Sequence, residues 1–254
     1  MTTATEQPMF KLSKRLEVVT AAELGAQGPE IALTPEELEP AENWRLNYQP
    51  RLIESAEKYV RGLLTPPAKG NGKAGEELGG PRVGPYVPWD VVAYSPIELG
   101  GAGLMGEPNK IVPAGSWIVV YALMWANPVS DPAHGYKVPA NMQLGGRPYR
   151  VTCHQLSKTT GAALPPLSYT GSFPPVVPAL SWWPFFIRTP STTTAELIEV
   201  NITADIEFPA QPFAAFATWH YDVDMEMPWF WGFPPPVPPQ WRHGMPMQYL
   251  IFPQ

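Results

Sequence analysis

The second part of this chain has very little charge. Residues 111–254 carry 14 charged side chains in 144 positions, yet they hold eight of the ten tryptophans and 22 of the 34 prolines. A soluble domain normally has about a quarter of its residues charged. A surface this poor in charge is hard to keep dispersed unless another subunit, a ligand or a membrane covers it. The composition therefore predicts large contact surfaces in this part of the molecule.

Cysteine and long apolar runs are also nearly absent. Cys153 is the single cysteine, so no intrachain disulfide can form. It lies in an alternating run, where a buried structural thiol is expected rather than a nucleophile. No stretch reaches the roughly 18 apolar residues of a transmembrane helix, and the first residues lack the apolar segment of a signal peptide. We expect no transmembrane segment, and a location in the cytoplasm or in an assembly released without a signal peptide.

Clustered positive charge is missing as well. The net charge is −6 and the isoelectric point is near 5.3, and the longest basic cluster, Lys11, Lys14 and Arg15, is soon followed by Glu17. Nucleic acid binding needs clustered lysine and arginine, so no nucleic acid partner is expected. The chain also contains no G-x-S-x-G turn and no GxxxxGK[ST] phosphate loop. The sequence thus carries no catalytic signature that we can identify.

Composition divides the chain into four regions. Residues 1–65 form an acidic, partly helical region, in which Thr34-Pro35 is typical of a helix start and residues 51–64 have one apolar face. Residues 66–85 are half glycine and proline, which predicts a linker or surface loop. Residues 86–228 are expected to form a β-sandwich domain, and 229–254 a proline- and aromatic-rich tail.

The fold class follows from alternation in the third region. At 196–208, Val200, Ile202 and Ala204 point one way along a strand, and Asn201 and Thr203 point the other way. Further strands are predicted at 89–94, 116–126, 150–156 and 213–227, whereas 161–190 shows neither a strand nor a helix pattern. Even spacing, proline-rich turns and a lack of intervening helices predict an antiparallel β-sandwich, jelly-roll or immunoglobulin-like.

Aromatic residues in the predicted loops and tail are the candidates for an interface or a ligand site. They are Trp182, Trp183, Trp229, Phe230, Trp231, Phe233 and Trp241. Exposed rings could stack on the apolar faces of sugars, but rings of this size also fill cores. The run from Pro234 to Pro239 favours a stiff polyproline conformation, which loses little entropy on docking. The tail could lie on its own domain or reach a neighbouring subunit, and both alternatives stay open.

One row of polar residues could hold a metal. His220, Asp222, Asp224 and Glu226 share one face if the segment is a strand. Such groups could bind a divalent cation such as calcium, or act as acid and base. Same-face neighbours are about 6.6–7 Å apart along a strand, so all four cannot reach one ion without bending. The simpler interpretation is the solvent-facing side of a half-buried strand, and no cofactor is expected.

These features lead to three hypotheses about function. The first is a structural, self-assembling β-sandwich subunit that forms an oligomer, filament, layer or coat of identical chains, because permanent interfaces are rich in aromatics and poor in charge. The second is a module that binds carbohydrate or an apolar small molecule through loop tryptophans. The third is a metal-dependent enzyme centred on residues 220–226.

Overall fold

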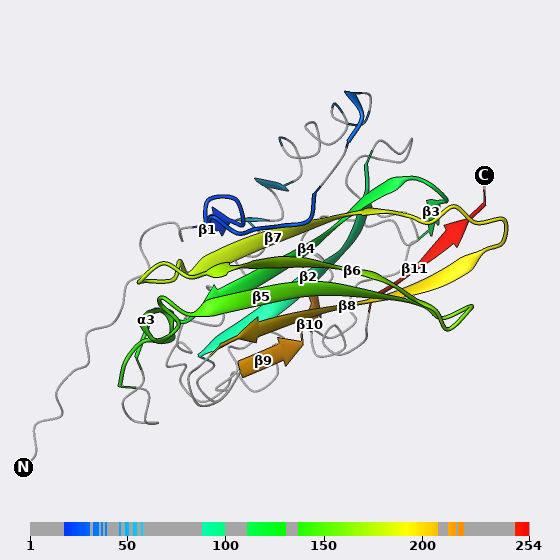
Figure 1. Cartoon of the computed structure of the whole chain (residues 1–254). Helices are drawn as coiled ribbons and strands as arrows, with labels where there is room; N and C mark the ends of the chain where they lie inside the picture. The colour runs from blue at the N-terminus through cyan, green and yellow to red at the C-terminus, as the bar shows by residue number, and fades with distance from the viewer. Residues whose placement is uncertain are drawn as a thin grey trace, which may run out of the picture.

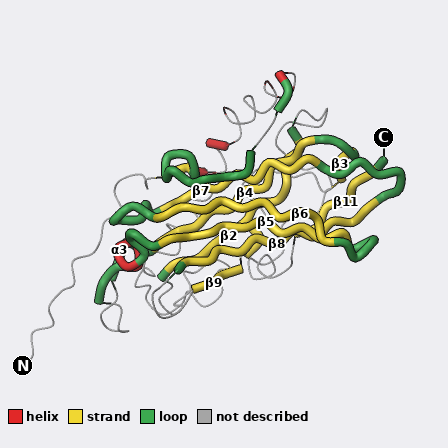
Figure 2. The backbone as a smooth tube through the Cα atoms, viewed as in Figure 1, coloured by secondary structure: helices red, strands yellow, loops and turns green. Residues whose placement is uncertain are grey.

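The part of the chain that the structure describes is mainly β. The computed structural model describes residues 18–30, 33–35, 37, 39, 46, 49–50, 53–54, 57, 88–99, 111–130, 137–207, 213–216, 218–220 and 247–253. Within them, two sheets pack face to face in a sandwich-like arrangement (Figures 1 and 2). The one helix with defined bounds in these ranges is α3, a single turn at Ala140–Gln143.

Sheet A contains five strands in the order β1-β7-β4-β2-β10. Their bounds are β1 Val18–Thr20, β2 Trp89–Glu98, β4 Trp117–Ala126, β7 Leu180–Arg188 and β10 Thr218–His220. The long strands β2, β4 and β7 pair antiparallel. The short strands β1 and β10 run parallel to β7 and β2. Sheet A therefore has an antiparallel centre and a short parallel strand at each edge.

Sheet B contains six strands, with the order β3-β11-β8-β5-β6 and β9 also paired to β8. Their bounds are β3 Ile111–Pro113, β5 Pro148–Ser157, β6 Ala163–Ser172, β8 Glu196–Ile206, β9 Phe213–Phe216 and β11 Met247–Phe252. All pairs are antiparallel except β3 with β11. The expectation of a wholly antiparallel sandwich is thus wrong. The three-residue strands β1, β10 and β3 each pair parallel with their neighbour, at the edges of the two sheets.

Two segments pass between the sheets at the sides of the sandwich. Residues 18–30, which we call the strap, begin in β1 at the edge of sheet A. Gln27 in the strap then exchanges both backbone hydrogen bonds, each 2.8 Å, with Thr170 on β6, the edge of sheet B. On the other side, the chain passes from β9 in sheet B to β10 in sheet A across residue 217. Both sides of the sandwich are therefore joined by the chain itself.

The core between the sheets confirms the alternating strand predicted at 196–208. On β8 every second side chain from Ile198 to Ile206 is buried, and the residues between them are partly exposed. These side chains pack with Cys153 on β5 and with Trp183 on β7. The strands predicted at 89–94, 116–126 and 150–156 are also confirmed, as parts of β2, β4 and β5. Inward-facing apolar residues at period two thus position both sheets.

The outer face of sheet A is buried as well. Nine of the ten residues of β4 are buried, because its alternate side chains join two different clusters. Val119, Tyr121, Leu123 and Trp125 belong to the second cluster, together with Tyr94, Leu180 and Trp182. A strand covered on both faces is expected to be continuously apolar. The uncharged sequence of β4 therefore reflects a sheet with two covered faces.

The segment 161–190, which was expected to lack regular structure, contains β6 and β7. This expectation is wrong, since prolines conceal the strand pattern. Pro165 and Pro166 lie on β6, an edge strand where one side needs no partner. Pro184 lies on β7 beyond residues 180–182, the part of β7 that pairs with β1. At these positions a missing N–H disrupts no inter-strand pair on that side.

The end of the chain belongs to the sandwich rather than to a separate tail. Strand β11 lies between β3 and β8, and its Tyr249 and Ile251 are buried. The expectation that the sandwich ends before residue 229 is corrected in this respect. Residues 66–85 and 229–246 lie outside the described residues.

The acidic first region is described in part. The backbone N–H of Thr34 donates to the carboxylate of Glu37 at 2.8 Å, which is one half of a capping box. Glu37 also lies 3.9 Å from the guanidinium of Arg188 on β7. Within the helix predicted at 51–64, Ile53 and Glu54 are helical. The helix start predicted at Thr34 is thereby confirmed.

Candidate functional site

The polar row proposed for metal binding lies largely outside the described residues. His220 is the last residue of β10, and Asp222, Asp224 and Glu226 are beyond the described ranges. Within those ranges no group of three or more histidine, cysteine, aspartate and glutamate side chains could hold a metal ion. The metal hypothesis therefore receives no support from the described residues, and the row itself stays a prediction.

Two of the seven aromatic residues predicted to form an interface or ligand site lie within the described residues, and five lie outside them. Trp182 and Trp183 lie on β7, where successive side chains point to opposite faces of sheet A, and both are 0% exposed. Trp183 packs in the core between the sheets. Trp182 packs on the outer face of sheet A, where the centroids of its ring and of the Tyr121 ring are 4.6 Å apart. Both side chains therefore pack inside the protein, where a ligand cannot reach them. Trp229, Phe230, Trp231, Phe233 and Trp241 lie outside the described residues.

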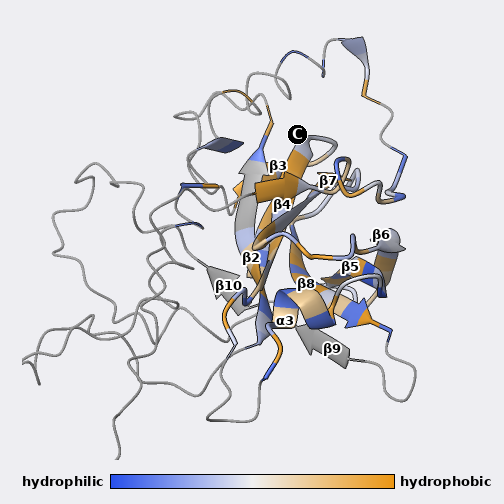
Figure 3. Cartoon of the chain, turned by 90° about the vertical axis from the view of Figure 1, so that its left-hand side faces the viewer, coloured by the Kyte–Doolittle hydropathy of each residue, from blue (hydrophilic) through white to orange (hydrophobic). Residues whose placement is uncertain are grey.

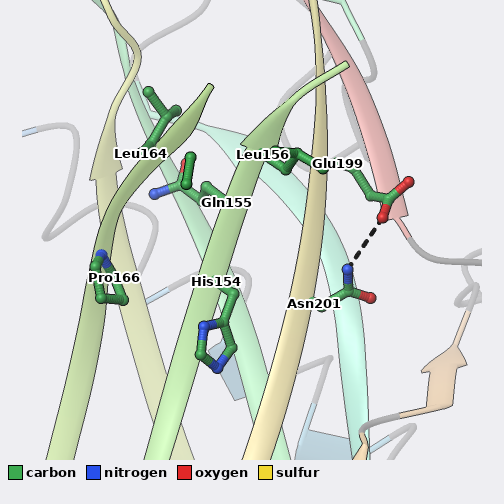
Figure 4. Close-up of a pocket in the computed structure, with 8 residues that line it drawn as sticks. His154, Gln155, Leu156, Leu164, Pro166, Glu199 and Asn201 are labelled. Carbon is green, nitrogen blue, oxygen red and sulfur yellow. Dashed lines mark hydrogen bonds between the residues drawn. The ribbon is translucent and has the colours of Figure 1, made fainter. Parts of the chain in front are cut away.

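A shallow hollow of about 340 Å³ lies on the outer face of sheet B (Figure 4). Its residues come from β5, β6 and β8, and they include His154, Leu156, Leu164, Pro166, Glu199 and Asn201. The hollow forms where the pairing of β5 with β6 shifts register between Cys153 and Gln155, opposite the two prolines of β6. A bulge of this kind re-aims side chains. The result is an apolar floor with a polar margin.

The polar groups around this hollow already have partners. Nε2 of His154 lies 3.1 Å from Oγ1 of Thr203, and the amide of Asn201 donates to Glu199 at 3.2 Å. Lys158 forms an ion pair with Glu199 at 3.3 Å. Burial opposes the charge of Glu199, but hydrogen bonds from Asn201 and Lys158 lower its pKa overall. The hollow thus lacks convergent polar groups that are ready for a ligand.

Cys153 confirms the expectation of a structural thiol. It is fully buried in the core, and this burial raises the pKa of the thiol. A nucleophilic cysteine needs a lowered pKa and access to solvent. Cys153 therefore has the properties of a packing residue, not those of a catalytic one.

Exposed large apolar side chains gather at the two ends of the sandwich. Among the described residues they are Leu46, Ile111, Val138, Met142, Val176 and Phe252. Figure 1 shows α3 at one end of the sandwich and β3 with β11 at the other. Met142 lies on α3, Ile111 on β3 and Phe252 on β11. Scattered apolar side chains are ordinary on a protein surface, whereas grouped ones mark contact sites.

At the α3 end, Val138, Met142 and Val176 are 45%, 54% and 55% exposed. Backbone contacts bring them together, since the N–H of Val177 donates to the carbonyl of Asn141 at 2.9 Å. A second hollow, of about 400 Å³, adjoins Val176. It lies between the strap and the loop after β6, and its lining is mixed: Glu23 and Ser172 are polar, whereas Val19, Leu24, Phe173, Pro174, Val176 and Pro178 are apolar. We call this hollow and its three exposed neighbours the socket.

At the opposite end, the outer face of β3 and β11 carries a small apolar patch. Ile111 is directly opposite Leu250, and Pro113 is opposite Phe252. Val112 and Ile251 between them are buried in the core, so the four outer residues share one face. Ile111 is 56% and Phe252 39% exposed. We call Ile111, Pro113, Leu250 and Phe252 the knob.

The sequence pattern did not identify either of these surfaces. Ile111 and Phe252 lie on short strands, where alternation over three to six residues gives little signal, and Phe252 falls in the predicted tail. Val138 and Met142 lie between the strands predicted at 116–126 and 150–156, and Val176 lies in the segment expected to lack structure. The one available signal was the scarcity of charge over residues 111–254, which predicted contact surfaces without locating them.

Comparison of the chain with protein family models, curated proteins and solved structures finds no match in any of the three. In the described residues no helix is long and apolar enough to cross a membrane.

Proposed function

We propose that this protein is a structural, self-assembling β-sandwich subunit that forms a homo-oligomer. The observation that carries the proposal is the pair of apolar surfaces at opposite ends of one sandwich. Five of the six exposed large apolar side chains of the described residues contribute to them. Interfaces between permanent partners are apolar at their centre and poor in charge. A second copy of the chain offers such a partner at both ends.

The edges of the sheets favour association through surfaces rather than by strand addition. Strand β6 is a long edge strand, but Pro165 and Pro166 interrupt its row of N–H groups and the strap pairs with it at Thr170. Strands β1, β3 and β10 are three residues long in the described chain. Short edges and edge prolines are common protections against uncontrolled pairing of sheets. Assembly would therefore use side-chain contacts.

The finer fold that we propose is a jelly roll. The connections from β4 to β5, β6 to β7 and β7 to β8 each cross from one sheet to the other, as in double Greek-key sandwiches. An immunoglobulin-like domain with its inter-sheet disulfide would need two cysteines, and the chain has one. Jelly rolls serve as coat, lectin and cupin domains, so the fold alone does not select the function.

The aromatic residues from Trp229 to Trp241 have a place in this proposal. They belong to the connection from β10 to β11, which is anchored to a sheet at each end. We propose that this connection adds apolar contact to the interface. Ligand binding through the loop tryptophans is the weaker alternative, because Trp182 and Trp183 are buried and the hollow on sheet B has a margin of paired polar groups.

The test is the mass of the full chain in solution. Light scattering across the micromolar range should give a mass that is a multiple of 28.0 kDa and that rises with concentration. Added salt should not dissociate the complex, because apolar contacts are not screened. A monomer at all concentrations would refute the proposal and favour a ligand-binding module.

A further inference from the structure

We propose that the outer face of sheet A is a docking surface for an amphipathic helix, and that its occupant is the helix predicted at 51–64 of the same chain. This helix docks as a unit that can separate from the sandwich. The contact lies within one chain, so it does not depend on the proposed self-assembly. Figure 3 shows the two sheets as separate layers, with β2 and β10 of sheet A on one side and β5 and β6 of sheet B on the other.

The outer face of sheet A is aromatic and fully buried. The side chains of its cluster are at most 2% exposed, and they are Tyr94, Val119, Tyr121, Leu123, Trp125, Leu180 and Trp182. Among the described residues, the partly buried apolar ones packed against the cluster are Val18, Leu99, Ala179 and Phe186. All four lie in sheet A or directly beside the ends of its strands. Such complete burial of large rings needs a further apolar layer, which therefore comes from a segment beyond these strands.

The first region of the chain reaches this face at two described points. At one edge, Val18 of β1 packs against the cluster. At the end of β7, the guanidinium of Arg188 lies 3.9 Å from the carboxylate of Glu37. Arg188 shares a face of β7 with Phe186, which packs against the cluster. Glu37 is therefore on the outer side of sheet A, shortly before residues 51–64.

The helix predicted at 51–64 has one side against protein. Ile53 and Glu54 are helical, and Ile53 is partly buried whereas Glu54 is exposed. Glu57, one turn after Ile53, is 8% exposed. A glutamate is rarely buried this far unless the surface that carries it packs against other groups. The side of the helix that carries Ile53 and Glu57 therefore faces the protein.

The length and chemistry of this helix fit the face. Along β4 the cluster extends from Val119 to Trp125, which is about 20 Å at roughly 3.3 Å per residue. A helix over residues 51–64 is about 21 Å long at about 1.5 Å per residue. Its apolar side chains, which bring no charge into the contact, are Leu52, Ile53, Ala56, Tyr59, Val60, Leu63 and Leu64. Docking thus makes the aromatic side chains of this face part of an internal contact rather than of a contact between copies.

Two substitutions to the same side chain test the docking. Val60→Gln places an amide on the apolar side of the helix, whereas Glu54→Gln places the same amide on its exposed side. Glutamine favours helix at least as well as valine does, so the first change acts through the contact and not through helix formation. Hydroxyl-radical footprinting of the full chain, read by mass spectrometry, measures the exposure of individual aromatic side chains.

Two neighbouring tryptophans separate undocking from unfolding. Trp182 belongs to the outer cluster, and Trp183 belongs to the core between the sheets. Val60→Gln should raise the oxidation of Trp182 at least about fivefold, because a docked element can open without global unfolding. Trp183 should stay as protected as in the unaltered chain. Glu54→Gln should leave both tryptophans protected.

Three results would overturn the inference. Continued protection of Trp182 in Val60→Gln would mean that another segment, such as residues 229–241, occupies the face. Joint exposure of Trp182 and Trp183 would show that the helix cannot separate from the sandwich. Protection of Trp182 that is lost when the unaltered chain is diluted would assign the face to a second copy. A monomeric unaltered chain refutes the proposed self-assembly but leaves this docking intact.

Discussion

The hydroxyl of Tyr169 on β6 donates a hydrogen bond to the carbonyl oxygen of Pro184 on β7, at 2.6 Å. It is a direct link from sheet B to sheet A. The ring of Tyr169 also meets the ring of Phe185 edge to face at 5.2 Å between centroids. Gly28 of the strap lies so close to this ring that an added Cβ would overlap it. Tyr169 thus joins both sheets and the strap at one side of the sandwich.

Removal of this hydroxyl should weaken the fold measurably. Tyr169→Phe keeps the ring but leaves the carbonyl of Pro184 without this donor. The expected loss is about 1–3 kcal/mol of unfolding free energy, the usual cost of an unsatisfied buried partner. Urea unfolding measures this loss. Thr170→Ala, on the exposed side of the same strand, should change the unfolding free energy by less than about 0.5 kcal/mol, and an equal effect would argue against the inter-sheet bond.

Alkaline pH should unfold the protein through its buried tyrosines. Burial raises the pKa of Tyr169 from 10.0 to about 12, and burial also raises the pKa of Tyr121 and Tyr249. Below pH 10 both the folded and unfolded states keep these protons, so stability is unaffected. Between pH 10 and 12 the unfolded state releases them first, and each tyrosine then costs roughly 1.4 kcal/mol of stability per pH unit.

Melting temperature against pH tests this expectation. The curve should be flat up to about pH 10 and should then fall steeply, with tyrosinate absorbance rising together with unfolding. In Tyr169→Phe one of the shifted groups is absent, so the fall above pH 10 should be shallower. Tyrosine ionisation that is complete well before unfolding would contradict the burial of these hydroxyls.

Alternation on β8 gives a matched pair of substitutions. Ile202 is buried in the core between the sheets, whereas Thr203 points outward and contacts His154. Ile202→Ala should cost about 2–5 kcal/mol, because it removes buried methylene groups and leaves a cavity. Thr203→Ala should cost less than about 1 kcal/mol. Chemical denaturation measures both, and equal costs would refute the one-sided strand.

Much of the fold could be predicted from the sequence because its strong signals are local. Alternation at 196–208 and the apolar run at 116–126 predict β8 and β4, since period-two burial appears directly in the order of residues. The strands at 161–190 were missed because proline has no N–H, and its effect depends on whether a neighbouring strand would need a donor at that position. Whether Pro165 or Pro184 lies at an unpaired position is a property of strand order, which the sequence does not display.

The candidate site was less predictable for the same reason. Trp182 and Trp183 have the composition of a contact surface, but β7 places them on the two faces of sheet A, and each face is covered. The socket combines residues of the strap with residues some 150 positions later, and the knob pairs Ile111 with Leu250. Such surfaces arise from tertiary contacts between distant segments. Scarcity of charge predicts that contact surfaces exist, but it does not show which residues form them.

Close packing at α3 predicts a severe effect of a small substitution. A Cβ added at Gly145 would overlap the carbonyl oxygen of Pro175, a backbone atom that cannot turn aside. Gly145→Ala should therefore destabilise the chain by about 1–3 kcal/mol and disturb the socket. Gly161→Ala meets nothing within 4 Å but has a positive φ of 75°, so it carries backbone strain alone. Thermal unfolding compares the two, and light scattering shows whether assembly is lost only at Gly145.

Strand β11 makes the last residues of the chain essential to the fold. It supplies five register pairs to β8 and three to β3, and the hydroxyl of its buried Tyr249 lies 3.1 Å from Oε1 of Gln155. Deletion of residues 247–254 would expose the core beside β8 and remove the support of β3. The truncated chain should lose its cooperative unfolding transition and aggregate, as seen by circular dichroism and light scattering.

Removal of 229–241 alone, with a glycine-serine linker of equal length in its place, should leave the β signal intact, because both anchoring strands remain. A truncated chain without β11 that stays folded and cooperative would show that the sandwich does not depend on its last strand.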